Sequence, residues 1–530
     1  MSEEEKLLFV RESSGLVKEV GTGFALLLPI ALTLGPWFHY FGPQVSSWYP
    51  GAHLLPMYAI GSGIVFFEAI SLMCLMLAMP RSGASYHFTG RGLSPIFGVM
   101  EGWRSVITNP VFRGTGSFFA VQVFAGGLVV IGNAISTGGG GTALLDFAVE
   151  LQNNVIWLFV AAAIMIFIGF IFSYLSVKWL GWFVIILGII NIVALLVADL
   201  ILIGTPINQG VWDAVFGSGS WATGPGAFDP TIGFDALNPV DYTVFNPGAI
   251  GGALILTVGG MWPYLIMPVA GEVSQPSKNI PLSNVGGWAG IAGFFMLSAF
   301  AVQSSMGNNL YGINLASGVN GFYAGFGNYA AIALGGGGLA WFVILCPIFA
   351  SVLDSPSNAL WVTRPMHSMA MDRFCPEAFA SVHPKYHVPH ITLWFWLILS
   401  LGTVAYATIL QAFFHTALAS LIGVAFTYVF IRWQMGLAAV SLPYYRPTLW
   451  ERSGAWRFLG IPLVSLAGLI SGSAFFYALI AYVPDPNVQF EVWFTVIVYV
   501  IGQIAYMYYG AKNKAKGIEM SAIFGQLPPE

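Results

Sequence analysis

The sequence is poor in charged residues and in cysteine. Only 8% of its 530 residues are charged, whereas a soluble domain carries about 25% because its surface must be solvated. The three cysteines, Cys74, Cys346 and Cys375, predict no disulfide framework. A net charge of −4 without any basic stripe excludes a nucleic-acid partner. A large soluble protein is therefore excluded.

Hydrophobic residues make up 57% of the chain, and its mean hydropathy is +0.77. Many fall in runs of about 20 residues, the length that crosses a hydrocarbon core as a helix. Lipid offers the backbone no hydrogen bonds, so such runs form helices rather than open sheet. The runs lack the alternation of barrel strands. We predict an all-α integral membrane protein with about 12 transmembrane helices in a lipid bilayer.

The positions of basic residues support a topology. We expect spans near 21–40, 54–79, 97–131, 154–175, 179–204, 248–270, 286–306, 336–360, 390–409, 413–434, 457–482 and 490–510. With a cytoplasmic N-terminus, 17 of the 19 basic residues, Arg432 among them, fall in cytoplasmic loops or the termini. Cytoplasmic loops are enriched in Lys and Arg. We therefore expect both termini in the cytoplasm, at the cell membrane.

Two predicted spans are interrupted near their middles. The first contains Pro29, Gly35 and Pro36, and the sixth contains the pair Gly259–Gly260 followed by Pro263. Such residues free backbone groups, which are tolerated at membrane depth around a cavity or buried site. Two interrupted spans five apart are typical of a five-plus-five inverted repeat with a midplane ligand. The alternative is a pair of simple packing kinks.

Three stretches resemble the amino acid–polyamine–organocation (APC) superfamily of secondary transporters. They are PRSGASYHFTGRGLSPIFG at 80–98, GEVSQPSKNIP at 271–281 and VTRPMHSMAMDRFCPEAFASVHPKYHVPH at 362–390. The resemblance implies a leucine-transporter-type fold with repeats at about 21–204 and 248–434, after a cytoplasmic segment 1–20. Spans eleven and twelve (457–510) and a cytoplasmic tail (511–530) follow. It also implies a cytoplasmic gate motif of Arg81, Glu272, Arg364 and Asp372.

The resemblance further implies a substrate site at the interrupted middles of spans one and six, lined by spans three, eight and ten. The expected residues are Ala31, Leu32, Thr33, Leu34, Gly35, Val258, Gly259, Gly260, Met261 and Trp262. Exposed N–H groups at a half-helix end suit a carboxylate, and exposed carbonyls suit an ammonium group or a cation. The chain departs from the family pattern in span one, where Gly21-Thr22-Gly23 comes too early. It departs again in span six, where Met261-Trp262-Pro263-Tyr264 replaces Gly-Phe-Glu.

Charged residues inside the spans are few, and each costs at least about 2.5 kcal/mol at mid-bilayer unless it is paired or hydrated. Glu101 and Arg104, three residues apart on one helix, are expected to form a structural pair. Glu68, Arg113 and Asp354, with the neighbouring Ser355, form the coupling or ion-pair set. We hypothesise that Arg113 pairs with Asp354 or Glu68 and that one carboxylate carries a coupling proton. The alternative is a static ion pair.

The sequence thus predicts a secondary active transporter that moves amino acids by alternating access. We expect coupling to H⁺ or Na⁺, no cofactor and no metal site. Alternatives are a carrier of polyamines or other organic cations, or an amino acid exchanger. A membrane sensor or a channel is the non-transport alternative. An intramembrane enzyme is not expected, since no HExxH motif occurs and the histidines lie in or near predicted loops.

Overall fold

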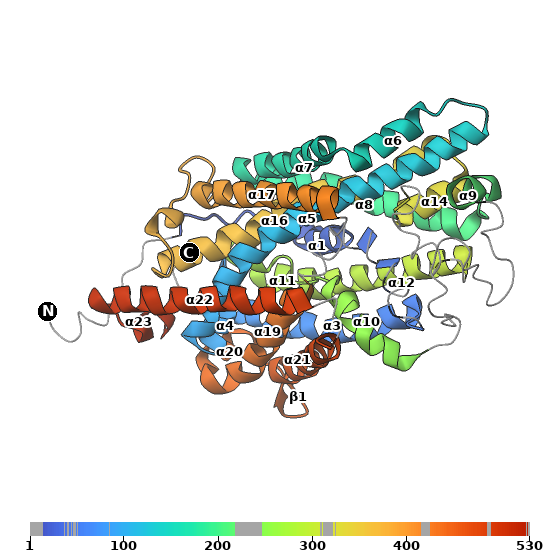
Figure 1. Ribbon diagram of the computed structural model, residues 1–530. Coiled ribbons are helices and arrows are strands. Elements are labelled where there is room, and N and C mark those ends of the chain that lie inside the picture. Colours follow the sequence, from blue (N-terminus) through green and yellow to red (C-terminus); the bar gives the residue numbers. More distant parts are fainter. Residues whose placement is uncertain are drawn as a thin grey trace.

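The computed structural model describes most of the chain as a bundle of helices that lie roughly along one direction (Figure 1). The described residues are 14–35, 38–39, 42–43, 45, 49, 51–83, 85–217, 246–307, 310, 322–323, 325–414, 425–484, 489–525 and 527. Pro36 and residues 415–424 of predicted span ten lie outside them. Within the described residues, β structure comprises one hairpin of two strands with two residues each, and one isolated bridge.

The first half of the chain supplies eight described α-helices. They are α1 (Thr22–Thr33), α3 (Leu54–Ala78), α4 (Ser85–Gly92), α5 (Pro95–Thr137), α6 (Ala143–Asn153), α7 (Val155–Leu175), α8 (Val177–Gly204) and α9 (Gln209–Phe216).

The second half begins with a short helix and a 3₁₀ turn, α10 (Pro247–Gly259) and η1 (Met267–Glu272). The elements that follow are α11 (Pro276–Pro281), η2 (Leu282–Gly286), α12 (Gly287–Met306), α14 (Phe326–Leu334), α15 (Gly338–Ile344), α16 (Cys346–Met371), η4 (Glu377–Ala380) and α17 (His390–Phe414). The last are α19 (Ala425–Tyr445), α20 (Pro447–Arg452), β1 (Arg457–Phe458), β2 (Ile461–Pro462), α21 (Leu463–Tyr482), α22 (Gln489–Ala515) and α23 (Met520–Gly525).

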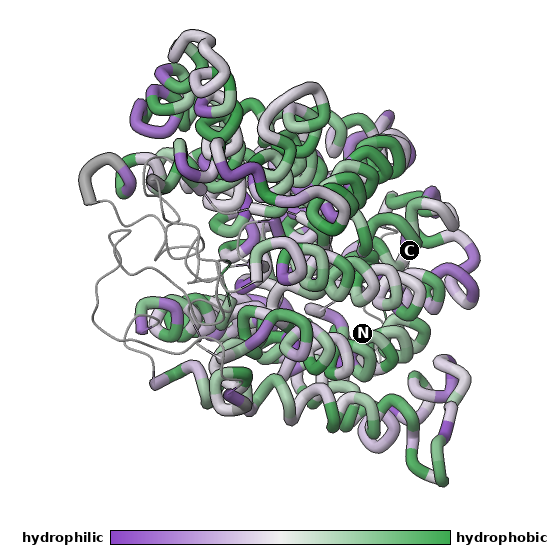
Figure 2. The backbone as a smooth tube through the Cα atoms, turned by 90° about the vertical axis from the view of Figure 1, so that its right-hand side faces the viewer, coloured by the Kyte–Doolittle hydropathy of each residue, from purple (hydrophilic) through white to green (hydrophobic). Residues whose placement is uncertain are grey.

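The prediction of an all-α membrane protein is confirmed. Nine helical segments of the described chain are long and apolar enough to cross a bilayer, and α1 and α10 are shorter apolar helices. Green, hydrophobic segments run along most helices in Figure 2. Large apolar side chains are exposed along α7, α8, α21 and α22, among them Ile164, Trp182, Ile480 and Trp493. A soluble monomer rarely exposes so extended an apolar surface, whereas lipid solvates one.

The boundaries predicted for spans ten and eleven were wrong. Helix α19 continues to Tyr445, so Arg432 lies inside it and is 1% exposed, not in a cytoplasmic loop. The charge is tolerated there because Glu68 of α3 pairs with it. Residues 457–462 form the hairpin β1–β2, and α21 begins only at Leu463.

Helix α5 forms the centre of the bundle. It is 43 residues long and packs against α16, α17, α22 and α4. Pro110 lies within it without ending the helix. Because α5 spans the bundle and is buried over most of its length, its polar side chains point into the interior rather than into lipid.

The ends of α1 and α10 meet in the interior. Helix α1 ends at Thr33 and α10 at Gly259, and Gly260, Met261 and Trp262 are not helical. The Thr33 hydroxyl donates to the Trp262 carbonyl and accepts from the Trp262 N–H, both at 3.3 Å. The start of α1 lies instead beside the segment after η1, where Val20 bridges Val273. The two short helices therefore approach their meeting point from opposite ends of the bundle.

Candidate functional site

A buried pocket lies beside the non-helical segment that follows α10. Helix α5, the segment 262–265, helix α16 and helix α19 line it. The lining residues are Arg104, Asn109, Phe112, Trp262, Tyr264, Leu265, Asp354, Ser357, Asn358, Trp361, Tyr428, Ile431 and Met435. An apolar pocket with a few polar groups deep inside a helical bundle is typical of a small-molecule site.

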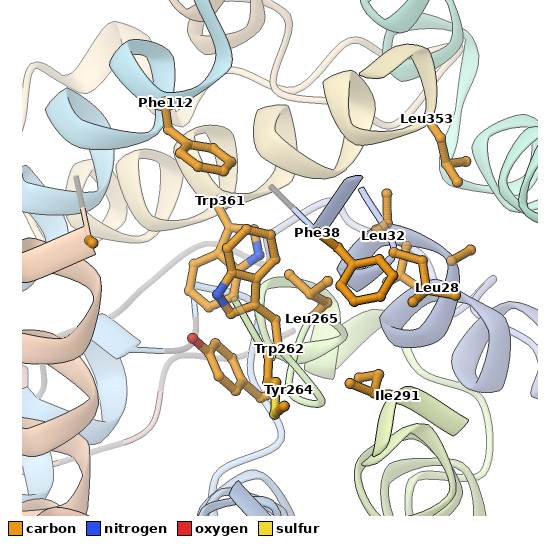
Figure 3. Close-up of a cluster of buried hydrophobic side chains, with 14 of the residues drawn as sticks. Leu28, Leu32, Phe38, Phe112, Trp262, Tyr264, Leu265, Ile291, Leu353 and Trp361 are labelled. Atoms are coloured by element: carbon orange, nitrogen blue, oxygen red, sulfur yellow. The ribbon is translucent and has the colours of Figure 1, made fainter. Parts of the chain in front are cut away.

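Aromatic rings make up much of the pocket wall. The ring of Phe112 contacts those of Trp262 and Tyr428 edge-on, with centroids 5.5 Å apart in both pairs. Tyr264 meets Trp361 in the same manner at 5.8 Å. Figure 3 shows Phe112 and Tyr264 on either side of the indoles of Trp262 and Trp361. Such a wall can pack against an apolar side chain or, by its π faces, against an ammonium group.

One polar group of the pocket is the guanidinium of Arg104. Its Nε and Nη2 donate to Glu101 at 2.8 and 2.5 Å, as the three-residue spacing on α5 predicts. Its Nη1 is buried and has no hydrogen-bond partner. The indole N–H groups of Trp262 and Trp361 are likewise buried and unpaired. Three residues of the pocket lining thus each carry a buried hydrogen-bond donor that has no acceptor.

A second polar group is Asp354 of α16, which the structure pairs with Arg113 of α5. Nη1 of Arg113 donates to the aspartate at 2.6 Å, and its other nitrogens bond the hydroxyls of Ser117 and Ser351. The carboxylate contributes to the pocket wall, whereas the arginine does not. Ser355, predicted as part of this set, donates instead to the backbone carbonyls of Met165 and Ser351.

Glu68 lies in a different pair, away from the pocket lining. Both carboxylate oxygens accept from Arg432 of α19, through Nε at 2.6 Å and through Nη2. Nη1 of Arg432 donates to the carbonyl of Val258, in the last turn of α10. The guanidinium also lies 4.6 Å from the ring centroid of Phe475. This arginine therefore caps the interrupted helix α10 and neutralises Glu68.

Of the ten predicted substrate residues, Trp262 lines the pocket. Two carbonyls at the end of α1 are occupied, because the amide of Asn191 donates to Leu34 at 3.0 Å and to Ala31 at 3.4 Å. The carbonyls of Val258 and Trp262 bond Arg432 and Thr33. The other predicted residues, Leu32, Gly35, Gly259, Gly260 and Met261, pack around these helix ends. Side chains of the protein thus satisfy backbone groups that the sequence analysis assigned to a ligand.

The predicted gate residues Glu272 and Arg364 form a bidentate pair, with Nε and Nη2 of the arginine 3.0 and 2.9 Å from the carboxylate oxygens. The hydroxyl of Ser82 donates to Glu272 at 3.1 Å. Gly83 follows with φ +100°, and a Cβ there would lie 2.3 Å from Oγ of Ser368. The sequence PRSG at 80–83 therefore needs its glycine where α3 leads into α4.

Asp372 joins a neighbouring cluster. Tyr86 donates to it at 2.7 Å and Arg91 lies 3.5 Å from it. Arg91 also lies 2.9 Å from Nδ1 of His87. The side chain of Arg81 bonds the carbonyl of Pro80 at 2.9 Å. The gate region described by the structure is thus built from α4 as well as from the predicted motif.

Arg432 was not among the predicted site residues, and Arg104 was predicted only as the structural partner of Glu101. A signal for Arg432 existed, because the predicted spans held two deep acids, Glu68 and Asp354, for one deep base, Arg113. The second acid needed a second base, and Arg432 is the third residue from the end of predicted span ten (413–434). For Arg104, pairing with Glu101 was enough to explain a charged residue inside a span. Only the structure shows that its Nη1 has no hydrogen-bond partner.

The fold and the buried pocket define a multi-pass helical membrane protein with an internal small-molecule site. A family model described as amino acid permease matches residues 44–519, so the chain belongs to the amino acid permease family. This match confirms the superfamily resemblance. Among curated proteins, the chain is similar to the glutamate/serine transporter AimA of Bacillus subtilis (strain 168). The two are 27% identical over 261 residues, which are 47% of this chain and 42% of that protein.

Proposed function

We propose that this protein is a permease that carries amino acids across the cell membrane by alternating access, with both termini in the cytoplasm. The observation that carries the proposal is the buried pocket beside the ends of α1 and α10, with charged and aromatic groups together in its wall. An amino acid offers a carboxylate, an ammonium group and a side chain of variable polarity, and the pocket has partners for each. Membership of the amino acid permease family supports the same conclusion.

The arrangement of ion pairs is compatible with a conformation closed on the cytoplasmic side. The pair Glu272–Arg364 and the cluster around Asp372 join α4, the end of α16 and η1. Buried and hydrogen-bonded pairs of this kind hold helices together in one geometry and separate when the helices move apart. Alternating access requires such contacts to form in one state and break in the other.

The proposal is tested by reconstituting the purified protein in liposomes and measuring uptake of radiolabelled serine, glutamate and leucine. We expect saturable uptake, and accelerated uptake of label into liposomes preloaded with the same unlabelled amino acid. Flux that rises linearly with concentration and shows no counterflow would indicate a channel and overturn the proposal. Protein-free liposomes give the baseline.

We further propose that transport is coupled to protons and that Asp354, rather than Glu68, is the coupling carboxylate. Asp354 is part of the pocket wall, and a single arginine nitrogen holds one of its oxygens. Glu68 has both oxygens bound by Arg432 and contributes nothing to that wall. A coupling group must exchange its proton when the substrate site opens, which favours the carboxylate that the pocket reaches.

The test of coupling is uptake driven by an inward pH gradient. Asp354→Asn removes the exchangeable proton, so we expect the gradient to lose its effect while counterflow persists. The matched control is Asp199→Asn in α8, a buried acid that bonds Ser298 at 2.8 Å outside the pocket lining. This control retains the response to the gradient. An unchanged response in Asp354→Asn, or a wild-type response to a sodium gradient alone, would remove the proton role.

A further inference from the structure

The pocket wall contains an unusual concentration of unpaired donors. Nη1 of Arg104 and the indole N–H groups of Trp262 and Trp361 are all buried without a hydrogen-bond partner. The three residues come from α5, the segment after α10 and α16, yet all three line the same pocket. Buried polar groups in folded proteins are paired in the large majority of cases, so an orphaned donor calls for an explanation. A ligand with acceptor atoms supplies one.

The hydrogen bonds of the Arg104 guanidinium to Glu101 leave Nη1 as the nitrogen available to that ligand. Glu101 takes Nε and Nη2, and the ring of Tyr428 lies 5.6 Å from the guanidinium carbon. The phenol of Tyr428 donates away from the arginine, to Asn109 at 2.6 Å. The guanidinium is therefore held rigidly on two sides. A charged nitrogen that is pre-oriented in this way binds a carboxylate oxygen without further loss of side-chain freedom.

We propose that Nη1 of Arg104 binds the α-carboxylate of the transported amino acid, with the indole N–H groups of Trp262 and Trp361 as auxiliary donors. This assignment rests on the proposed permease function and adds the group that selects a carboxylate. It differs from the site expected from the sequence, where backbone groups of spans one and six hold the substrate. At those helix ends the carbonyls of Leu34, Val258 and Trp262 already accept from Asn191, Arg432 and Thr33, so they are less available to the ammonium group.

The charges around the pocket define the class of substrate further. Arg104 is balanced by Glu101 and Asp354 by Arg113, so the described ion pairs that border the pocket sum to zero charge. Burying an uncompensated charge is costly, whereas a zwitterion adds none. The substrate is therefore a net-neutral α-amino acid, and an acidic amino acid enters only with a compensating cation. Ser357 and Asn358 offer oxygen acceptors for the ammonium group.

The first test varies the ligand. Purified wild-type protein is titrated with L-leucine, L-leucinamide and 3-methylbutylamine, which share the side chain and the amino group; the last two lack the carboxylate and its negative charge. A charge-assisted hydrogen bond is worth about 1.5–3 kcal/mol, which corresponds to a factor of about 10 to 150 in affinity. We expect leucine to bind by such a factor more tightly than leucinamide. L-serine and L-serinamide provide the same comparison with a small side chain. Equal affinity for acid and amide would overturn the proposal.

The second test varies the protein. Arg104→Lys keeps a positive charge beside Glu101 but lacks Nη1, and the double variant Glu101→Gln/Arg104→Gln removes the pair without leaving a lone buried charge. In both, we expect the preference for the acid over the amide to fall to about onefold. The matched control is Glu68→Gln/Arg432→Gln, which removes a buried pair that does not line the pocket. This control keeps the preference for the acid.

The outcomes separate this proposal from the proposed function. If amino acids bind and are transported but the acid preference survives in both Arg104 variants, the carboxylate is held elsewhere and only this inference fails. If the wild-type protein binds and transports none of the twenty amino acids, the permease function fails and this inference with it. The Arg104 variants support both the permease function and this inference if they lose the preference for leucine over leucinamide while their affinity for 3-methylbutylamine stays within about threefold of wild type.

Discussion

The pairs Arg432–Glu68 and Arg113–Asp354 have the same chemistry but different surroundings. Both join an arginine on one helix to a carboxylate on another, deep in the bundle. In the first pair both carboxylate oxygens are bound, and the remaining nitrogen caps α10. In the second, one hydrogen bond joins the arginine to the carboxylate, and two serines bind the other nitrogens.

This difference separates a structural pair from one that can change during function. Glu68 is bound at both oxygens and does not line the pocket, although its partner Arg432 lies 5.4 Å from the ring of the lining residue Tyr264. Asp354 forms part of the pocket wall, which gives a proton or a substrate a route to it. The presence of a buried ion pair is therefore uninformative by itself, and the number of contacts and the access to the pocket decide its role.

The largest effect is expected from Glu68→Gln. The amide NH₂ faces one of the two arginine nitrogens that the carboxylate accepted from, so Arg432 keeps a buried and uncompensated charge. Breaking one side of a buried pair costs about 3–5 kcal/mol. The free energy of unfolding in detergent, from denaturant titration, measures this loss.

The control for this prediction removes both partners. Glu68→Gln/Arg432→Gln leaves no buried charge, so we expect it to recover at least half of the loss, although the carbonyl of Val258 loses its strongest donor. If the double variant is less stable than Glu68→Gln, the arginine stabilises α10 more through capping than through the ion pair.

Local patterns allowed much of the fold to be predicted. Runs of about 20 apolar residues predict spans because a bilayer imposes their length. The Glu101–Arg104 pair could be predicted because its partners lie three residues apart on one helix. Both inferences need information from one segment only, and both agree with the structure.

Contacts between distant segments could not be predicted in the same way. Arg432 lies 364 residues after Glu68, so hydropathy alone placed its charge at the membrane edge and ended span ten too early. Most residues that line the pocket were not predicted, for a similar reason. Asn191, Arg432 and Thr33 donate to the carbonyls of Leu34, Val258 and Trp262. The local sequences of α1 and α10 do not indicate these partners.

The second prediction concerns the stability of Asp354→Asn. Asparagine keeps an oxygen that accepts from Nη1 of Arg113, and the contacts of the arginine to Ser117 and Ser351 survive. The variant still leaves the charge of Arg113 uncompensated, so we expect a loss of about 3 kcal/mol, at the lower end for breaking one side of a buried pair and less than for Glu68→Gln. The same denaturant titration measures it. A loss equal to or above that of Glu68→Gln would show that the two pairs are equivalent.

A third pair, Arg364–Glu272, lies among the predicted gate residues. Gly83→Ala disturbs the turn beside this pair and leaves its two charges in place. At φ +100° an alanine is strained, and its Cβ meets the hydroxyl of Ser368. We expect a loss of about 1–3 kcal/mol in the free energy of unfolding. The control is Gly116→Ala in α5, where a Cβ meets no atom within 4 Å and φ is not left-handed. Equal stability of both variants would show that the turn at Gly83 adapts.

The smallest effect is expected at the contact between α1 and the segment after α10. Thr33→Val keeps the shape of the side chain but removes the hydroxyl that bonds both the N–H and the carbonyl of Trp262 at 3.3 Å. These bonds are long, so their loss costs about 0.5–1.5 kcal/mol in stability. Because Trp262 supplies a donor to the pocket, we also expect a weaker affinity for leucine with its preference over leucinamide intact. Thr33→Ser, which keeps the hydroxyl, should restore the affinity, and failure to do so would place the effect in packing rather than in these hydrogen bonds.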